Sequence, residues 1–200
     1  MKPVTDFSSL DLKKRYTYAD YLTWEFSERV ELIKGWIHKM SPAPKRWHQK
    51  AETVLSSKFY SHFENHSCEV YHSPFDVRLV KNKGQKDQEI DTVVQPDICL
   101  VCDPSKLDDA GCKGAPDLII EILSESTSKK DYNEKFNLYQ ENGVKEYWLV
   151  QPELFYIEIY ALENDIYERF GLFEKRNSPD LVSGKLFPDL KVSMAEVFAR

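Results

Sequence analysis

The sequence predicts an α/β fold in which helices interleave with a mostly buried sheet. Two runs, Ile98 to Val101 and Leu118 to Leu123, are apolar almost throughout, as strands covered on both faces are. From about Lys45 to Glu64, apolar residues instead recur at three- and four-residue steps, the spacing of a long amphipathic helix. The chain of 200 residues has the size of one ordinary domain, so residues 1–200 are expected to form a single one.

The segments before the long helix are predicted from capping and turn residues. Thr17 is suited to be the N-cap of a short helix that runs to Trp24. Lys34-Gly35 separates two strand-like runs, which predicts a hairpin. Ser41-Pro42-Ala43-Pro44 then interrupts regular structure. The hairpin strands are expected at Val30 to Ile33 and Trp36 to Met40.

After the long helix the pattern is mainly that of strands, with two more helices, the second at the C-terminus. A helix from about Thr127 to Asn142 is expected to end at Gly143, a residue favoured just beyond a helix C-terminus. Glu163-Asn164-Asp165 is the expected turn of a hairpin, and Ser193-Met194-Ala195-Glu196 matches a capping box for a short last helix. The remaining strands are expected at Glu69 to Tyr71, Phe75 to Val80, Glu146 to Val150, Tyr156 to Ala161 and Tyr167 to Phe170, with a polar surface loop at Lys81 to Gln88.

Composition excludes several classes of protein. Asp and Glu number 33 against 27 Lys and Arg, and the resulting net charge of −6 excludes a protein that holds DNA by bulk positive charge, though not a local basic groove. The 11 Tyr, 11 Phe and 4 Trp exclude a disordered chain. No run approaches the roughly 18 apolar residues of a membrane span, and Met1 to Leu10 lacks the apolar stretch of a signal peptide, so a cytoplasmic location is expected.

The cysteines lack the spacing of a disulfide framework, so reduced thiols are expected. Cys99 and Cys102 have a separation that can begin a zinc site, but such a site needs two more ligands, and Cys112 stands alone. Residues three apart on a strand also face opposite sides. Two small core residues are therefore the favoured interpretation, and a zinc-stabilised interaction domain is the alternative. The four cysteines are Cys68, Cys99, Cys102 and Cys112.

The most informative residues are carboxylates set in apolar strand sequence. Asp97 directly precedes one apolar run, and Glu121 lies inside the other. An unpaired buried carboxylate costs several kcal/mol, so such a residue needs a cation or a proton. Two acids on strands expected to be neighbours suggest a shared cation, and carboxylate oxygens are ligands that Mg²⁺ prefers. The alternative is that each acid pairs with a different Lys or Arg, or is solvated at a strand end.

Three further residues are candidates, each with a simpler alternative. Glu31 lies among aliphatic residues, but strand alternation would let it point outward. Lys135 borders the apolar stripe of its expected helix, from which a long side chain can reach a neighbouring strand; a surface ion pair with Asp131 is the alternative. His48 borders the apolar face of the long helix, where a structural histidine is the simpler interpretation.

Four segments, in unbroken order from about Tyr16 to Tyr167, are similar to those of one protein family. They are Glu31 to Gly35 followed by His48, Gln95-Pro96-Asp97-Ile98, Gly114 to Ser124, and Asp131-x-x-x-Lys135 leading into Tyr139 and Gly143 to Val150. They resemble the Uma-two endonuclease family, a branch of the PD-(D/E)XK nuclease superfamily. The resemblance implies a restriction-endonuclease-like fold, in which a mixed central sheet of four to five strands is flanked by helices and here carries an additional C-terminal β-hairpin. It also implies a Mg²⁺-dependent phosphodiesterase site.

The resemblance assigns residues to the superfamily motif. Pro96-Asp97 matches the "PD", Glu121 matches the "(D/E)", and Glu31 matches an acid that often precedes them. Leu123 stands where the motif has its lysine, and Lys135 is the candidate replacement. Lys145 is a poorer candidate.

The resemblance also implies roles for these residues. Asp97, Glu121 and the backbone carbonyl of Ile122 would hold Mg²⁺, for which Mn²⁺ can substitute. Lys135 would orient the attacking water or stabilise charge on phosphorus, and Glu31 would complete the metal shell or hold a ligating water.

The implied partner is nucleic acid, with DNA favoured over RNA, and the net charge predicts weak, salt-sensitive binding. A catalytically silent nuclease-fold module that binds a protein or nucleic acid is the alternative function, because the motif lysine is missing and the chain is acidic overall. The aromatic-rich stretch from Phe155 to Phe173 is a candidate homodimer surface. The expected phosphate contacts lie near the starts of two helices and are Lys45, Arg46, His48, Lys50, Lys129 and Lys130.

Overall fold

A computed structural model describes residues 2–40, 45–82, 84–124 and 130–200. Its centre is a six-stranded sheet in the order β12-β11-β10-β9-β6-β3. Strands β9 and β10 are parallel and all other neighbours are antiparallel, so the sheet is mixed, as predicted. The strand bounds are β3 Glu69–His72, β6 Ile98–Val101, β9 Leu118–Ile122, β10 Glu146–Gln151, β11 Tyr156–Glu163 and β12 Ile166–Glu174.

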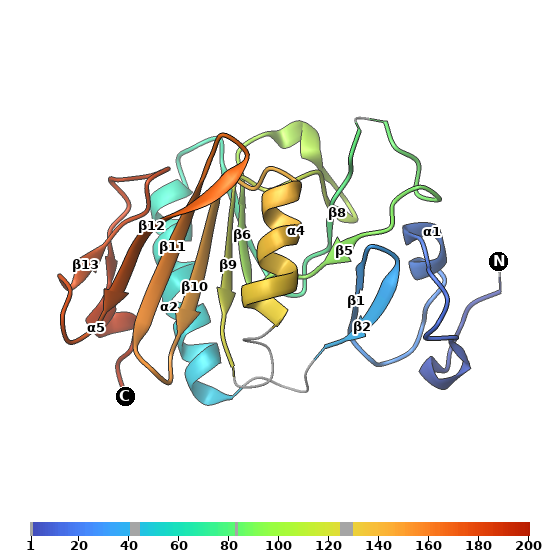
Figure 1. The fold of residues 1–200 in the computed structure, drawn as a ribbon, viewed down its shortest axis with the longest axis horizontal. Helices are drawn as coiled ribbons and strands as arrows, with labels where there is room; N and C mark the ends of the chain where they lie inside the picture. The colour runs from blue at the N-terminus through green and yellow to red at the C-terminus, as the bar shows by residue number, and fades with distance from the viewer. Residues whose placement is uncertain (1, 41–44, 83, 125–129) are drawn as a thin grey trace.

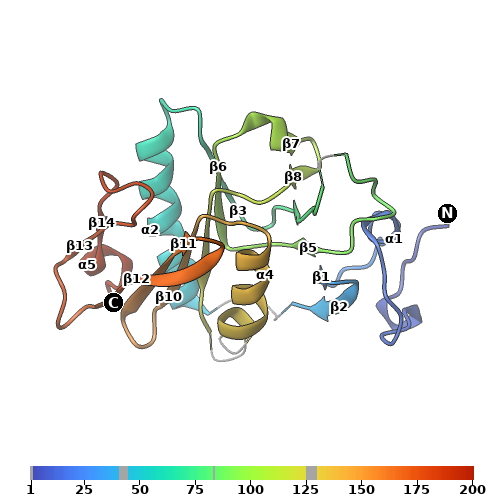
Figure 2. The same cartoon turned by 45° about the horizontal axis from the view of Figure 1, so that its top comes forward.

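Helices cover both faces of this main sheet. Helix α2 (Arg46–Phe63) lies on one face, and α4 (Phe136–Glu141), preceded by the π-helical turn η3 (Asp131–Lys135), lies on the other (Figures 1 and 2). The predicted long helix is confirmed to within one residue at each end. It forms because its apolar positions recur at helical spacing and are buried against the sheet; they are Ala51, Leu55, Phe59 and Phe63.

A second sheet lies toward the N-terminal end of the molecule, in the order β2-β1-β5-β4-β8-β7 (Figure 1). The predicted hairpin is confirmed, and both turn residues, Lys34 and Gly35, have positive φ, as a tight two-residue turn requires. A separate pair, β13 (Leu181–Val182) and β14 (Val192–Ser193), precedes the last helix, α5 (Met194–Val197). The strand bounds of the second sheet are β1 Val30–Ile33, β2 Trp36–Lys39, β4 Val77–Arg78, β5 Val93–Val94, β7 Leu107–Asp108 and β8 Gly111–Lys113.

The shorter elements follow their caps. Helix α1 (Tyr18–Tyr21) is shorter than predicted but begins with the expected N-cap, Thr17, which forms a capping box with Asp20. Two single-turn 3₁₀ helices, η1 (Phe7–Ser9) and η2 (Pro104–Lys106), complete the described elements. The strand predicted from Phe75 to Val80 is shorter in the structure, where only β4 is a strand. Several two-residue strands were not predicted, because a segment of two residues is too short to show a periodic pattern.

Alternation along the central strands sorts their side chains between the two helical layers. Ile120 of β9 packs in the cluster that contains α2, and Ile119 packs in the cluster that contains α4. Because side chains alternate along a strand, Glu121 belongs to the α4 face with Ile119. This register decides which helix can supply a partner for the buried acid.

The cysteine prediction is wrong for two of the four thiols, because Cys68 and Cys102 form a disulfide. Strands β3 and β6 are antiparallel neighbours that pair Glu69 with Val101, so the next step of the register brings the two cysteines opposite each other. Sheet pairing, rather than local spacing, therefore selects them. The bond also removes Cys102 from any zinc site with Cys99, which is buried among apolar side chains.

The second long helix also differs from its prediction. Its described part opens with the π-helical turn η3, continues as α4 and is followed by Gly143 at positive φ, as expected. The predicted start, Thr127, lies outside the described residues. None of the helices in the described part of the chain combines the length and hydrophobicity that a membrane span requires.

Candidate active site

Asp97 and Glu121 come together at one end of β6 and β9. The antiparallel register pairs Ile98 with Ile120, so its continuation by one residue sets Asp97 opposite Glu121. Residues directly opposite each other in such a pair have Cβ atoms about 4.5–5.5 Å apart. The Ile122 backbone N–H donates to Asp97 Oδ2 at 2.7 Å, which ties Asp97 to the strand that carries Glu121. The predicted neighbourhood of these two carboxylates is thus present.

Lys135 lies beside Glu121 and is almost fully buried. Its Nζ donates to Glu121 Oε1 at 2.8 Å and lies 2.9 Å from Glu31 Oε1. Asp131, one turn earlier, is also buried, and its Oδ1 lies 3.9 Å from the same ammonium. The alternative of a surface Asp131–Lys135 ion pair is therefore wrong, because the pair lies in the interior.

Glu31 reaches this cluster from β1 of the second sheet. Its side chain is only 1% exposed, which overturns the alternative of an outward-facing residue. Besides Lys135, it forms an ion pair with Lys130 through Oε2, and the Gln95 backbone N–H donates to its Oε1 at 3.1 Å. Glu31 therefore joins the two sheets at the site.

The charges of the cluster perturb the pKa values of its members. Burial alone would raise the pKa of Glu31, but the ammonium groups of Lys135 and Lys130 outweigh it and lower that pKa to about 2. Burial raises the pKa of Glu121 well above its usual range, and Asp131 and the other nearby carboxylates add to the effect while Lys135 opposes it. Burial opposes the charge of Lys135, yet Glu121 and the neighbouring acids hold its pKa well above the ordinary value.

The composition of the cluster fits a divalent cation. Four carboxylates accompany two ammonium groups, so negative charges exceed positive ones by two when every group is ionised. Among the described residues, hydrogen bonds and ion pairs reach only one oxygen each of Asp97 and Glu121. The described residues hold no group of three or more His, Cys, Asp or Glu placed to enclose a metal, so an ion held by Asp97 and Glu121 would need further ligands from backbone, water or substrate, as Mg²⁺ commonly has. The cluster comprises Glu31, Asp97, Glu121, Asp131, Lys130 and Lys135.

His48, predicted as a phosphate contact, instead faces Asp97. Its Nε2 lies 3.3 Å from Asp97 Oδ2, and its Nδ1 lies 3.9 Å from Glu52 Oε2. Burial lowers the pKa of His48, but the hydrogen bond and charge of Asp97 outweigh burial and raise it above its usual value. The buried Nδ1 has no hydrogen-bond partner among the described residues.

Of the other predicted phosphate contacts that the structure describes, only Lys130 lies in the buried cluster. Lys130 belongs to the buried cluster, whereas Lys45 is exposed and pairs with Glu153 at 3.0 Å. The Arg46 guanidinium lies 3.8 Å from the centre of the Trp47 ring, at the first turn of α2. Lys50 lies on the same helix, and Lys129 falls outside the described residues.

Of the two candidate lysines, only Lys135 contacts Glu121, and a tyrosine that the sequence analysis did not identify also contacts it. Lys145 is exposed and pairs with Asp117 at 2.7 Å, so Lys135 alone of these two contacts Glu121. The Tyr139 hydroxyl donates to Glu121 Oε1 at 2.7 Å. A tyrosine in the buried stripe of a helix signals a polar partner, because a buried hydroxyl is rarely left unbonded.

Comparison with known proteins decides the family. A family model described as "Uma2: Putative restriction endonuclease" matches residues 18–195. The chain belongs to the Uma2 family. Glu31, Asp97, Glu121 and Lys135 all lie within the matched Uma2 region, and the predicted resemblance is confirmed.

Two relatives show how far the Uma2 likeness extends. The "uncharacterized protein slr1290" of Synechocystis is 29% identical over 149 residues, which cover 73% of this chain and 74% of that protein. A crystal structure described as "a putative nuclease belonging to DUF820" from Anabaena variabilis shares 21% identity, has a TM-score of 0.69, and covers 92% of this chain and 98% of that one. The crystal structure supports the nuclease-like α/β fold, and the family supports nuclease activity in general terms.

Proposed function

We propose that this protein is a Mg²⁺-dependent endonuclease that hydrolyses phosphodiester bonds in DNA. The observation that carries the proposal is the meeting of Asp97 and Glu121 across neighbouring strands, with the Lys135 ammonium 2.8 Å from Glu121. Family membership supports the reaction class, and the excess negative charge of the cluster supports the cofactor.

Asp97, Glu121 and the backbone carbonyl of Ile122 would hold the ion. When bound, Mg²⁺ polarises a phosphate oxygen and lowers the pKa of a coordinated water. The hydrogen bond from the Ile122 N–H fixes the Asp97 carboxylate, and the Tyr139 hydroxyl fixes that of Glu121. Both acids would therefore need little rearrangement to act as ligands.

Lys135 is the proposed substitute for the motif lysine. Because three surrounding carboxylates outweigh the effect of burial and keep it protonated, it is a fixed positive charge that can stabilise the charge developing on a phosphate. Glu31 would act as a positioning residue, since it holds Lys135 on one oxygen and Lys130 on the other.

Plasmid nicking tests the proposal. The wild-type protein is expected to nick supercoiled DNA in Mg²⁺ or Mn²⁺, and Asp97→Ala is expected to abolish nicking. Asp189→Ala is the matched control, because Asp189 is an exposed aspartate whose ion partner is His62. If Asp97→Ala nicks as fast as the control, the assignment fails.

The alternative function, a catalytically silent nuclease-fold module, rested on Leu123 standing at the motif position and on the acidic charge balance. The contact of Lys135 with Glu121 argues against it, because an ammonium group reaches the acid from another element. Calorimetry separates the two functions: saturable Mn²⁺ binding that Asp97→Ala removes favours the enzyme. Undetectable Mn²⁺ binding by the wild-type protein favours the silent module.

A further inference from the structure

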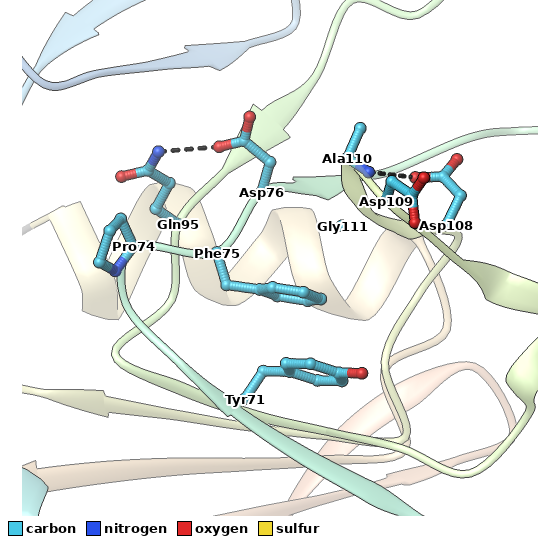
Figure 3. A pocket seen from close by; sticks show the side chains of 9 residues that line it. All are labelled: Tyr71, Pro74, Phe75, Asp76, Gln95, Asp108, Asp109, Ala110 and Gly111. Carbon is cyan, nitrogen blue, oxygen red and sulfur yellow. Dashed lines mark hydrogen bonds between the residues drawn. The ribbon is translucent and has the colours of Figure 1, made fainter.

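A cavity of about 450 Å³ lies beside the candidate active site and contains none of the residues proposed to act in it. It opens between the loop that leads into β4 and the turn that joins β7 to β8 (Figure 3). Three of its lining residues are aspartates, and none is Lys or Arg. The lining consists of Tyr71, Pro74, Phe75, Asp76, Gln95, Asp108, Asp109, Ala110 and Gly111.

The floor of this cavity is a pair of stacked aromatic rings. The Phe75 ring lies over that of Tyr71, with centroids 4.1 Å apart and planes within 6° of parallel (Figure 3). The Tyr71 hydroxyl donates to Glu69 at 2.6 Å, which holds the lower ring in place. A rigid, flat ring face is a stacking platform for another planar group.

One wall presents a carboxylate in a defined orientation. Asp76 Oδ1 accepts hydrogen bonds from Gln95 Nε2 at 2.8 Å and from the Tyr21 hydroxyl at 3.2 Å. Arg29 donates twice to Gln95 Oε1, at 2.7 and 3.1 Å, and thereby sets which end of that amide faces Asp76. The hydrogen bonds that described residues make to Asp76 end on Oδ1, so Oδ2 is left to accept from a ligand.

The turn between β7 and β8 forms the opposite wall and packs closely against the wall that contains Asp76. The Asp108 carboxylate accepts from the buried Arg78 and from the Ala110 backbone N–H. Gly111 approaches so closely that a Cβ atom there would lie 2.2 Å from the Asp76 carbonyl oxygen, and its φ is +121°. The two walls are therefore built parts of the fold, and only glycine fits at the contact.

The chemistry of the lining favours a planar ligand with N–H donors. Three carboxylates repel a phosphate group, whereas a neutral planar ring with N–H donors on its edge would stack on Phe75 and donate to Asp76. Guanine presents two adjacent donors, N1–H and the 2-amino group, on one edge, and both can share the remaining oxygen of Asp76, Oδ2. Enzymes that extract a base from the stack recognise it in this way, by stacking and by hydrogen bonds to its pairing edge.

The cavity also adjoins the proposed site of hydrolysis. The Gln95 backbone N–H donates to Glu31, and the Ser73 backbone N–H donates to the Asp97 carbonyl at 3.0 Å. Gln95 and Asp97 are two residues apart, so their Cα atoms lie within about 7 Å of each other. A base in the cavity would therefore belong to a nucleotide close to the cleaved phosphate.

We propose that this cavity binds one unstacked guanine-type base of the substrate and so contributes to the choice of cleavage position. The proposal rests on the proposed nuclease function, because only a nucleic-acid substrate would bring a base to the cavity. Binding of the base itself requires neither the metal nor cleavage. Phe75 supplies the stacking face, and Asp76 accepts from the edge of the base.

Calorimetry with free guanosine tests the proposal in the absence of metal. Guanosine is expected to bind the wild-type protein and Asp97→Ala alike, and inosine, which lacks the 2-amino group, is expected to bind at least about 5-fold more weakly. Asp76→Asn and Phe75→Leu should each weaken guanosine binding by about 5-fold or more. Asp189→Asn is the control, and circular dichroism verifies that each variant is folded.

Three outcomes would overturn the proposal. Guanosine could fail to bind, it could bind Asp76→Asn and Phe75→Leu as tightly as the wild type, or N-acetylarginine amide could bind in its place, which would assign the cavity to a protein partner. Because guanosine has no phosphodiester bond, these results are independent of plasmid nicking. A failure of the base site can thus be told apart from a failure of the nuclease assignment.

Discussion

Replacing Lys135 by Met is the sharpest test of the buried charge cluster. The substitution keeps a long side chain but leaves Glu31, Glu121 and Asp131 without the ammonium that contacts all three. Removing one partner of a buried ion pair costs about 3–5 kcal/mol, which is a large part of the usual folding stability of 5–15 kcal/mol. We therefore expect a loss of about 3–5 kcal/mol in the free energy of unfolding at neutral pH.

The same substitution at Lys145 is the matched control. Lys145 also contacts one aspartate, but its side chain is 60% exposed, so Lys145→Met should cost at most about 1 kcal/mol. Urea unfolding in a chelating buffer, followed by tryptophan fluorescence to which the buried Trp148 contributes, measures both variants. The reasoning is refuted if Lys135→Met is no more destabilising than Lys145→Met.

The loss of stability in Lys135→Met should depend on pH, and the direction of that dependence tests the charge interaction. Without Lys135, the pKa of Glu121 in the folded protein would lie further above its unfolded value, so the fold would be relatively more stable at low pH and less stable as pH rises. The cost of Lys135→Met should accordingly shrink between pH 7 and pH 4. Adding Glu121→Gln to the variant should recover part of the stability, because one uncompensated charge is then removed.

Three further predictions concern stability. The pKa of Glu31 is about 2 in the folded protein and about 4.5 ordinarily, so its stabilising contribution is present above pH 4.5 and is lost as pH falls toward 2; acid titration of Glu31→Gln should show a flatter acid limb than the wild type. Mutating Cys68 and Cys102 together to Ser opens a cross-link between residues 34 apart and should lower the free energy of unfolding by about 3–4 kcal/mol in urea, whereas an unchanged midpoint would contradict the described bond. Gly111→Ala should lower Tm more than Gly84→Ala, since both glycines have positive φ but an added Cβ at Gly84 meets nothing within 4 Å; equal shifts in thermal unfolding would count against the close contact.

The elements that the sequence predicted well are those whose pattern is repeated locally. Helix α2 and strands β6 and β9 lie where periodicity and apolar runs indicated, because each buries several consecutive or regularly spaced side chains. Asp97 and Glu121 were identifiable for the same reason, since an acid interrupts an otherwise apolar strand pattern.

The remaining parts of the site depend on contacts between distant segments. Glu31 is buried only because β1 of the second sheet approaches η3, and alternation within β1 predicted the opposite. Cys68 and Cys102 are paired by the register of β3 and β6, which no spacing rule contains. The second sheet was largely missed because most of its strands have two or three residues.

The sequence by itself determined the α/β class, the family and two acids of the candidate site, because these follow from local periodicity and from short motifs. Tertiary structure decided which charges meet. Lys135 on η3 contacts Glu121 of the main sheet and Glu31 of the second sheet, and the contact with Glu31 depends on packing between residues about 100 positions apart. Side-chain partners of that kind are set by strand register and layer contacts, which single-sequence patterns do not encode.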